Sequence, residues 1–361
     1  MTTKKDILFY AILRPQRSPS QRYRIEQFFQ AIEKEGLTFQ YRYLLNEHQD
    51  TILYSKGHYF QKILVVLSCL YQLSRDGLFL VHKFKYVFIQ RELIMLGTAF
   101  FEKWYAKKTI MIYDFDDAIW LPNISEANKR LAFLKHPEKV NESIAHAQKI
   151  VAGNDFLKKH ALLFNQNVIV IPTVLDTEHY KRKTPYIEKQ NKQVCIGWSG
   201  SHTTIAHFKT ALPVLYKLKE KYGDKIYFKI VGDPNFEDEK LGIKGIKWTF
   251  ETEINELEEI DIGIMPLPRD NWSEGKCGLK GLVYMAMGIP SVMSNVGVNA
   301  SIVQHGTNGY LVDKEEDWIS VLSLLIENPE LRMQVGSRGR KTIEEKYAVE
   351  VFKDDFVGLF K

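Results

Sequence analysis

The sequence predicts an α/β fold made of two domains of similar size, each with a parallel sheet and crossover helices. Its 361 residues exceed the length, about 250–300 residues, at which a single hydrophobic core usually stops growing. Short apolar runs alternate with longer helix-like segments along the whole chain, which is typical of parallel sheets. Between residues 176 and 192 the alternation gives way to a polar stretch without apolar periodicity, which indicates a linker.

These observations divide the chain into four parts. We predict an N-terminal domain over residues 1–175, a linker over 176–192, a second domain over 193–340, and a C-terminal helix over 341–361 that packs back on the N-terminal domain. In two α/β domains joined by one linker, the carboxyl ends of the strands normally face one another across a cleft. Ligands are expected in that cleft.

The individual elements follow from apolar runs that are bounded by polar residues, Gly or Pro. In the N-terminal domain, strands are predicted over 7–13, 39–45, 86–90, 109–113, 149–152 and 168–171, and helices over 20–34, 59–73, 93–107, 141–147 and 155–164. In the rest of the chain, strands are predicted over 194–197, 226–231, 246–249, 262–265, 291–294 and 309–312. Helices are predicted there over 205–221, 279–287, 318–327, 329–346 and 349–359, with a short one after Asn299.

The composition narrows the classes of partner. Apolar residues make up 45% and charged residues 26%, the balance of a globular protein. The net charge of +5, from 49 basic and 44 acidic residues, is mild and not clustered, which argues against a nucleic-acid partner. Cys69, Cys195 and Cys277 lie far apart, so neither a disulfide framework nor a zinc site is expected. These cysteines fit a reducing cytoplasm. The mild positive charge leaves anionic small molecules or a membrane surface as partners.

Two apolar runs bear on membranes. The run over residues 7–13 is too short for a signal-peptide core, and we interpret it as a first strand. The run over 63–73 is interrupted by polar residues and falls short of the roughly 20 residues that span a bilayer, so no transmembrane helix is predicted. The helix over 59–73, with Lys62, Lys83 and Lys85 around it, leaves two interpretations open: core packing, or peripheral contact with the inner face of the membrane.

The residues most informative about chemistry lie between Trp272 and Pro290. A Gly-containing loop with Lys276 and Lys280 leads into an apolar helix that ends at Gly288. Such a loop-to-helix junction offers backbone N–H groups and positive dipole to an anion, and the two lysines could add charge to it. A bound diphosphate would suit this arrangement. The alternative is a plain helix end with a solvated lysine face.

This segment resembles the signature of family 4 retaining glycosyltransferases with the glycosyltransferase-B fold, through Gly278, Met285-Ala286, Gly288 and Pro290. Four further stretches are similar to family segments in the same order. They are Ile171-Pro-Thr-Val-Leu-Asp-Thr-Glu-His-Tyr180, Ile260-Asp-Ile-Gly-Ile-Met-Pro-Leu267, Ile302-Val-Gln-His-Gly-Thr-Asn-Gly-Tyr-Leu311 and Asn328-Pro-Glu-Leu-Arg332. The resemblance implies two Rossmann-like domains that face one another across a cleft, the second of which binds a nucleotide sugar and the first an acceptor.

The resemblance also implies roles for residues of the loop. In the family, two glutamates with seven residues between them contact the donor sugar and the ribose. Here Gly275 and Val283 stand at those positions, so Glu274, one place early, is the candidate for the sugar contact and Tyr284 or Lys280 for the ribose contact. The family's Gly-Arg and lysine at the diphosphate are also missing.

A second Gly-containing loop, after the strand over 194–197, supplies the other half of the predicted donor site. It is similar to a Gly-Trp-x-Gly-Ser branch of the family, and its backbone N–H groups and hydroxyls could cradle phosphate at the start of a helix. The alternative is a plain turn capped by a threonine. The donor and phosphate candidates are Gly197, Ser199, Gly200, Ser201, Thr203, Lys276, Cys277, Gly278 and Lys280.

In the N-terminal domain the candidates follow the ends of predicted strands. Asp116 and Asp117, together with Asp114, could act as base or orient an acceptor hydroxyl, or they could cap a helix. Arg91 could contact the acceptor or form an ion pair. Arg22 and Arg24, from an arginine-rich loop, could hold phosphate or an anionic acceptor, or form a solvated face. No metal site is expected, because glycosyltransferases of this fold generally bind diphosphate without metal.

The resemblance therefore implies transfer of a hexose-type unit from a UDP- or GDP-linked sugar to a hydroxyl of a glycan or lipid-linked acceptor, with no further cofactor and with retention of configuration. Two rivals stay open: a nucleotide-sugar epimerase of the same architecture, and a degenerate relative that binds nucleotide or a partner protein without catalysis. The missing glutamate and the missing Arg-Lys pair are the reason for keeping the second rival.

Overall fold

The protein is described by a computed structural model that covers residues 4–94, 96–121, 136–183 and 193–361. The chain forms two compact units, one of Met1–Thr173 with Phe352–Lys361 and the other of Val174–Val351. The end of the chain therefore belongs to the first unit. Residues 176–183 of the predicted linker lie in the second unit, and residues 184–192 lie outside the described residues.

The first unit contains a parallel six-stranded sheet in the order β2-β1-β3-β4-β5-β6. The strands are β1 (Lys5–Leu13), β2 (Phe39–Leu45), β3 (Phe84–Gln90), β4 (Ile110–Phe115), β5 (Lys149–Ala152) and β6 (Val168–Val170). The helices are α1 (Pro19–Arg24), α2 (Phe29–Lys34), α3 (Glu47–Tyr54), α4 (Tyr59–Phe79), α5 (Phe100–Ala106), α6 (Lys139–His146), α7 (Asp155–Ala161) and α16 (Val349–Gly358).

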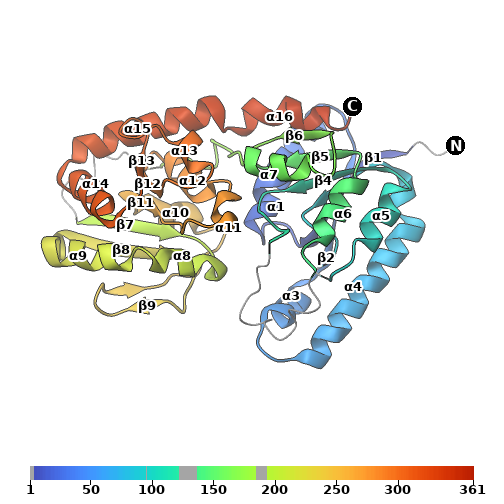
Figure 1. Ribbon diagram of the computed structural model, residues 1–361, viewed down its shortest axis with the longest axis horizontal. Helices are drawn as coiled ribbons and strands as arrows, with labels where there is room; N and C mark the ends of the chain where they lie inside the picture. Colours follow the sequence, from blue (N-terminus) through green and yellow to red (C-terminus); the bar gives the residue numbers. More distant parts are fainter. Residues whose placement is uncertain (1–3, 95, 122–135, 184–192) are drawn as a thin grey trace. The chain divides into compact units, whose positions relative to one another are not determined.

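Successive residues of β1 show how helices cover both faces of this sheet, because side chains alternate along a strand. The ring of Phe9 packs against Phe356 of α16 with centroids 6.4 Å apart, and against Phe29 of α2 at 5.7 Å. The hydroxyl of Tyr10 instead donates to Asp76 of α4 at 2.7 Å. On that second face α4, α5 and α6 lie side by side (Figure 1).

The second unit contains a parallel five-stranded sheet in the order β13-β12-β11-β7-β8. The strands are β7 (Val194–Ser199), β8 (Ile226–Val231), β11 (Ile262–Met265), β12 (Ser291–Ser294) and β13 (Tyr310–Val312), with a small antiparallel pair, β9 (Glu237–Asp238) and β10 (Ile243–Lys244). The helices are α8 (Ile205–Lys209), α9 (Leu212–Tyr222), α10 (Glu253–Glu258), α11 (Asn271–Glu274), α12 (Leu279–Ala286), α13 (Asn299–Ile302), α14 (Glu315–Glu327) and α15 (Pro329–Lys346). The α/β class with parallel sheets is thus confirmed.

The two faces of this second sheet are covered differently. Leucines of α9 and α14 form one apolar core with β7, β8 and β12. On the opposite face α12 packs directly on the strands, because two glycines leave room for it. A β-carbon at Gly263 would lie 2.4 Å from the ring of Tyr284, and one at Gly281 would lie 2.3 Å from the sulfur of Met293. This close packing places the start of α12 beside the end of β7.

Four sequence predictions were wrong in detail. The helix over 20–34 breaks at Ile25, whose backbone (φ −131°, ψ −61°) lies outside the helical region and whose side chain is buried. The helix over 93–107 begins only at Phe100, because the Leu93 N–H donates to the Glu102 carboxylate at 3.0 Å. The helix over 205–221 divides between Lys209 and Leu212, and Pro213 lies in the first turn of α9. The strand over 246–249 is reduced to a single bridge of Ile246 with Val231.

Helix α4 is longer than predicted and changes the membrane prediction. It continues past residue 73 to Phe79, and among the described residues it is the one helix, counted to Lys83, that is long and apolar enough to cross a membrane by length and composition alone. The prediction that no segment reaches this length is therefore wrong. A core helix of a soluble protein can pass the same test, so the side on which its apolar residues lie has to decide its role.

Candidate functional site

The structure brings the two predicted donor loops together in the second unit. Gly200 follows β7, and Lys280 lies in the first turn of α12. A β-carbon at Gly200 would lie 2.7 Å from the Cε of Lys280 and 2.4 Å from the ring of Trp198. The Lys280 ammonium lies 5.4 Å from the centre of that ring. A cation from one loop thus lies against the backbone of the other.

Backbone contacts hold the first of these loops at the carboxyl edge of the sheet. The Gly200 N–H donates to the carbonyl of Val231, the last residue of β8, at 2.9 Å. The next residue, Gly232, has φ +116°, and a β-carbon there would lie only 1.5 Å from the Gly200 carbonyl oxygen. Only glycine fits at this crossing. The ends of β7 and β8 therefore set the position of the loop.

The hydroxyls of this loop have partners of their own. The Ser201 N–H donates to Thr204 Oγ1 at 3.1 Å, the Thr204 N–H donates to the Ser201 carbonyl at 2.8 Å, and the hydroxyls of Ser201 and Thr203 lie 2.8 Å apart. This is the capped turn that sequence analysis left as the alternative. Ser201 and Thr203 are nevertheless exposed, so their hydroxyls can also meet a ligand.

Two of the predicted donor residues, Gly197 and Tyr284, support the fold of the second unit instead of facing a ligand. Gly197 is buried inside β7, where a β-carbon would lie 2.4 Å from the side chain of Ile260, so it serves packing and does not reach the loop surface. Tyr284 is fully buried, and its hydroxyl accepts the N–H of Ser199 at 2.8 Å. Burial raises the pKa of Tyr284. In this structure Tyr284 braces the end of β7 and does not present its hydroxyl for a ribose.

The loop with Glu274 is shaped by turns on both sides. Asp270 caps α11 by accepting the N–H of Ser273 at 2.7 Å, which places Glu274, half-buried, at the end of that helix. Gly297, with φ +55°, passes beneath it, and a β-carbon there would lie 2.9 Å from the Glu274 carbonyl oxygen. The ammonium of Lys276 lies 5.1 Å from the centre of the Trp272 ring.

Two residues of the same loop are buried at the start of α12. Cys277 is a buried thiol outside any disulfide, and Gly278 takes the left-handed conformation (φ +69°) that begins the helix. A β-carbon at Gly278 would lie 2.4 Å from Ile302 and 3.4 Å from Asn299 Oδ1. Cys277 and Gly278 therefore form the inner wall of the loop, while Glu274, Lys276 and Lys280 carry its polar groups.

Sequence analysis missed three residues that support this unit. Arg340 of α15 donates to the carbonyls of Thr177 at 2.8 Å and Ala286 at 2.7 Å, and so ties the segment around residue 177 to α12. The buried Asn299 donates to the Ser294 carbonyl at 2.9 Å. Asp233, buried after β8, lies 3.0 Å from Nδ1 of the exposed His202. Nothing in the local pattern marks them, because their partners lie on other elements.

The N-terminal candidates gather at the carboxyl ends of β3 and β4 in the first unit. Arg91 has a left-handed backbone (φ +65°), and its N–H donates to the Asp114 carbonyl at 2.7 Å. Its guanidinium donates to Asp116 at 2.8 Å and also to Asp117. Although burial acts against both charges, Asp116 and Asp117 raise the pKa of Arg91, and Arg91 lowers the pKa of Asp116. Asp116 is therefore an ionised acceptor of hydrogen bonds.

Arg24 and Asp114 form a buried ion pair behind this cluster. Their side chains are 2% and 0% exposed, and Arg24 Nη2 lies 2.5 Å from Asp114 Oδ1. Arg24 also donates to the carbonyl of Ile171. Burial raises the pKa of Asp114 to about 6, against the opposing effect of Arg24. With its donors committed in this way, Arg24 positions Asp114 and the end of the sheet in this structure, and an anion would reach it only if the pair separated.

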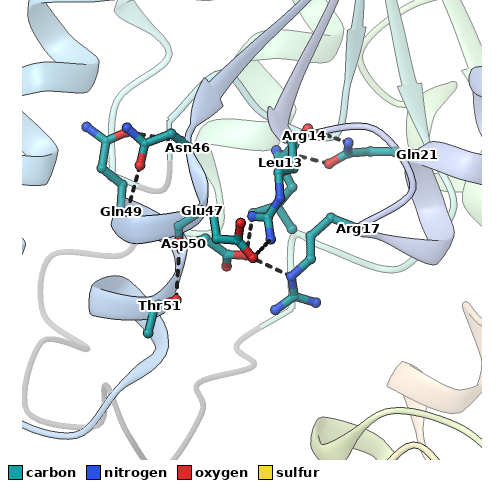
Figure 2. A network of polar contacts seen from close by, with 9 residues as sticks. All are labelled: Leu13, Arg14, Arg17, Gln21, Asn46, Glu47, Gln49, Asp50 and Thr51. Atoms are coloured by element: carbon teal, nitrogen blue, oxygen red, sulfur yellow. Dashed lines mark hydrogen bonds and ion pairs between the residues drawn. The ribbon is translucent and has the colours of Figure 1, made fainter. Parts of the chain in front are cut away.

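The other arginines of residues 14–24 are held as well, and Figure 2 shows the contacts of Arg14 and Arg17. Arg14 and Arg17 both donate to Asp50 of α3, at 3.0 Å and 2.7 Å, and Arg14 also contacts Glu47 at 3.1 Å. Arg22 is buried, with its guanidinium carbon 5.1 Å from the centre of the Tyr23 ring. The loop is therefore a network of ion pairs and packing contacts, and only part of its formal charge is available to a ligand.

No group of three or more His, Cys, Asp or Glu side chains that could hold a metal ion occurs within residues 4–94, 96–121, 136–183 and 193–361.

Residues 193–328 match the family model described as Glycosyl transferases group 1. This region includes β7, α12 and both donor loops. A curated relative, an uncharacterized glycosyltransferase from Haemophilus influenzae, is 33% identical over 78 residues, which are 21% of this chain and 22% of the relative. The matched segment therefore spans about a fifth of that relative's length.

Solved structures are similar over nearly the whole chain. Sucrose-phosphate synthase from Thermosynechococcus elongatus matches with a TM-score of 0.72 and 11% identity, over 99% of this chain and 98% of that chain. HepE from Anabaena, in complex with UDP and glucose, matches with a TM-score of 0.67 and 13% identity, over 98% and 99%. A glycosyltransferase from Rickettsia africae matches with a TM-score of 0.68 and 14% identity, over 99% and 98%. These likenesses confirm a glycosyltransferase-B fold with two Rossmann-like domains.

Proposed function

We propose that this protein is a glycosyltransferase that moves a hexose-type unit from a UDP- or GDP-linked sugar to a hydroxyl of a glycan or lipid-linked acceptor. The second unit would bind the donor, and the first unit would bind the acceptor. The family match over residues 193–328 and the fold support the enzyme class. Membership of family 4, retention of configuration and independence of metal rest on the resemblance of the motifs, and a cytoplasmic site of action rests on the three dispersed cysteines.

One observation carries the proposal: Lys280 lies against the loop at Gly200, at the start of α12. A diphosphate placed there would meet an ammonium group, the exposed hydroxyls of Ser201 and Thr203, and the positive end of a helix dipole. Lys276, in the same loop, would add a second positive charge. UDP bound to HepE, which has the same fold, supports a nucleoside diphosphate as the ligand.

In the proposed reaction, the bond between the sugar C1 and the diphosphate oxygen breaks while the acceptor oxygen forms its bond to C1. The diphosphate leaves with the bonding electrons, and Lys276 and Lys280 stabilise its developing charge. Glu274 orients the donor sugar by accepting hydrogen bonds from its hydroxyls. Asp116, whose pKa Arg91 lowers, is a weak base, so it orients the acceptor hydroxyl, whose proton passes to the leaving diphosphate.

Calorimetric titration with UDP, GDP and ADP tests donor binding. Lys280→Ala removes a charge-assisted hydrogen bond worth about 1.5–3 kcal/mol, so the affinity for the preferred diphosphate should fall about tenfold to a hundredfold. Lys341→Ala is the matched control, because that lysine is 72% exposed on α15 and pairs with Glu345 at 3.7 Å. Equal losses in both variants, or no binding of any nucleotide by the parent, would refute the proposal.

The two rival functions predict different outcomes in a screen of nucleotide sugars. A transferase slowly hydrolyses its own donor and, with an acceptor, forms a glycoside whose anomeric configuration NMR reads directly. An epimerase would interconvert sugars without acceptor, and a degenerate relative would bind nucleotide without any turnover. In the transferase, Glu274→Gln should lower turnover more than it weakens binding of UDP or GDP, because its contact is to the sugar.

A further inference from the structure

Helix α4 has apolar residues on two opposite sides, and only one of them belongs to the core. The inward side includes Val65, Cys69 and Leu73, which are 0–6% exposed. On the outward side, most apolar residues stand three, four or seven positions from one another, which places them on one helical stripe. They are Phe60 (73% exposed), Ile63 (56%), Leu64 (49%), Leu67 (54%), Tyr71 (70%) and Leu78 (53%). We call these six residues the α4 stripe.

The α4 stripe is large for a surface feature. It runs over the 19 residues from Phe60 to Leu78, or about 27 Å at a rise of 1.5 Å per residue. Two aromatic and four aliphatic side chains, each exposed to about half or more, reach the size, roughly 300–600 Å², of the largest apolar patch on a typical monomer. Phe79, at the end of the same helix, is also exposed, at 63%. A surface of this size marks an interaction site.

The exposed charges around the stripe are predominantly positive. Residues 55–85 contain five basic residues, Lys56, Lys62, Arg75, Lys83 and Lys85, and one acidic residue, Asp76. Asp76 and Lys62 are both buried, and Asp76 accepts hydrogen bonds from Tyr10, Arg42 and the exposed Arg75. Lys56, Lys83 and Lys85 are exposed near the two ends of the helix. An apolar stripe flanked by lysines is complementary to an anionic bilayer surface, whose headgroups attract the lysines while the apolar side chains enter the acyl boundary.

We propose that α4 docks the first unit on a membrane with anionic headgroups by laying the α4 stripe into the interface, without crossing the bilayer. Contacts on the inward side argue against crossing. Asp76 is bonded to Tyr10 at 2.7 Å and to Arg42 at 2.6 Å, and Lys62 donates to the Ser55 carbonyl at 2.7 Å. A spanning helix would break the bonds to the sheet and place Asp76 and Lys62 in hydrocarbon.

The docking surface deepens the proposed function without depending on it. A lipid-linked acceptor would lie in the same interface, so the first unit would reach its hydroxyl directly. Binding to vesicles, however, requires neither nucleotide nor turnover. A failure of vesicle binding and a failure of donor binding are therefore separate results.

Sedimentation with vesicles tests the proposal on the full chain. The protein should bind phosphatidylcholine vesicles that contain about 30% phosphatidylglycerol and bind pure phosphatidylcholine much more weakly, since the lysines need anionic headgroups. Leu67→Gln/Tyr71→Gln should lower the partition coefficient at least tenfold, while circular dichroism and thermal unfolding stay unchanged because both side chains face outward. The matched control is Leu163→Gln/Leu324→Gln, which alters leucines that are 74% and 42% exposed outside α4.

Several outcomes would overturn the proposal. Absence of vesicle binding, or equal binding by the α4 double variant and its control, would show that the stripe does not dock on lipid. A dimer in analytical ultracentrifugation that Leu67→Gln/Tyr71→Gln dissociates, without vesicle binding, would assign the stripe to a second copy of the chain. Resistance of the bound protein to alkaline carbonate extraction would indicate a spanning helix instead of surface docking.

Discussion

The buried pair of Arg24 and Asp114 permits a quantitative prediction about the first unit. The two side chains come from α1 and β4, and three nitrogen–oxygen distances between them lie at 3.1, 3.2 and 2.5 Å. Removing one partner of a buried pair leaves the other charge without compensation, which typically costs about 3–5 kcal/mol. We expect Arg24→Met to destabilise the first unit by this amount at pH 8.

The pH dependence follows from the pKa of Asp114, which burial raises to about 6. A carboxyl whose folded pKa exceeds its unfolded value, about 3.9, contributes stability that is present below the unfolded pKa and is lost as the pH rises through the folded pKa. Without Arg24 the folded pKa rises further, so Asp114 is protonated at pH 5 and no buried charge remains. The loss caused by Arg24→Met should therefore be much smaller at pH 5 than at pH 8.

The assay is native-state hydrogen exchange of peptides from β4 at increasing urea, because the two units need not unfold together. Arg17→Met is the control. That arginine lies just before α1 and is 47% exposed, and Asp50 keeps its contact with Arg14, so the loss should stay within about 1 kcal/mol. A loss below about 1 kcal/mol for Arg24→Met at pH 8, or an equal loss at pH 5, would refute the reasoning.

Two further predictions concern the donor unit. Gly232→Ala should cost more than about 4 kcal/mol and abolish nucleotide binding, because its β-carbon would lie 1.5 Å from the Gly200 carbonyl oxygen at φ +116°. The control is Gly242→Ala, which has a positive φ but open space around it and should cost only about 1–2 kcal/mol. Similar unfolding midpoints for the Gly232 and Gly242 variants would contradict the crossing of the loops. Tyr284→Phe should cost about 1–3 kcal/mol, because the Ser199 N–H loses its acceptor. Hydrogen exchange in β7 measures this, and unchanged protection there would argue against the brace.

The α/β class and the strand positions could be predicted because they depend on local periodicity. The strand predicted over 262–265 appears as Ile262–Met265, and that predicted over 291–294 as Ser291–Ser294. Helix ends were harder to predict. The segment before Phe100 stays out of the helix because the Glu102 carboxylate binds the Leu93 N–H, a contact that depends on how the chain folds back on itself.

The candidate site also has one part that could be predicted from the sequence and one part that could not. The loops with Lys276, Lys280 and Gly200 could be predicted, because glycines and basic residues at the junction of a strand or loop with a helix favour an anion site wherever they occur. The burial of Tyr284 could not, because it depends on Gly263 opening a space for its ring on a strand that is distant in sequence.

By itself the sequence determined the two parallel sheets, the donor loops and the positive charge near α4, since each follows from residue types at short spacing. The tertiary structure alone decided that Arg24 pairs with Asp114 and that Lys280 lies beside Gly200. It also decided that the apolar residues of α4 occupy two sides, one in the core and one exposed. The physical reason is that a local pattern shows which residues share a face, whereas the partner of that face is set by elements far away in the chain.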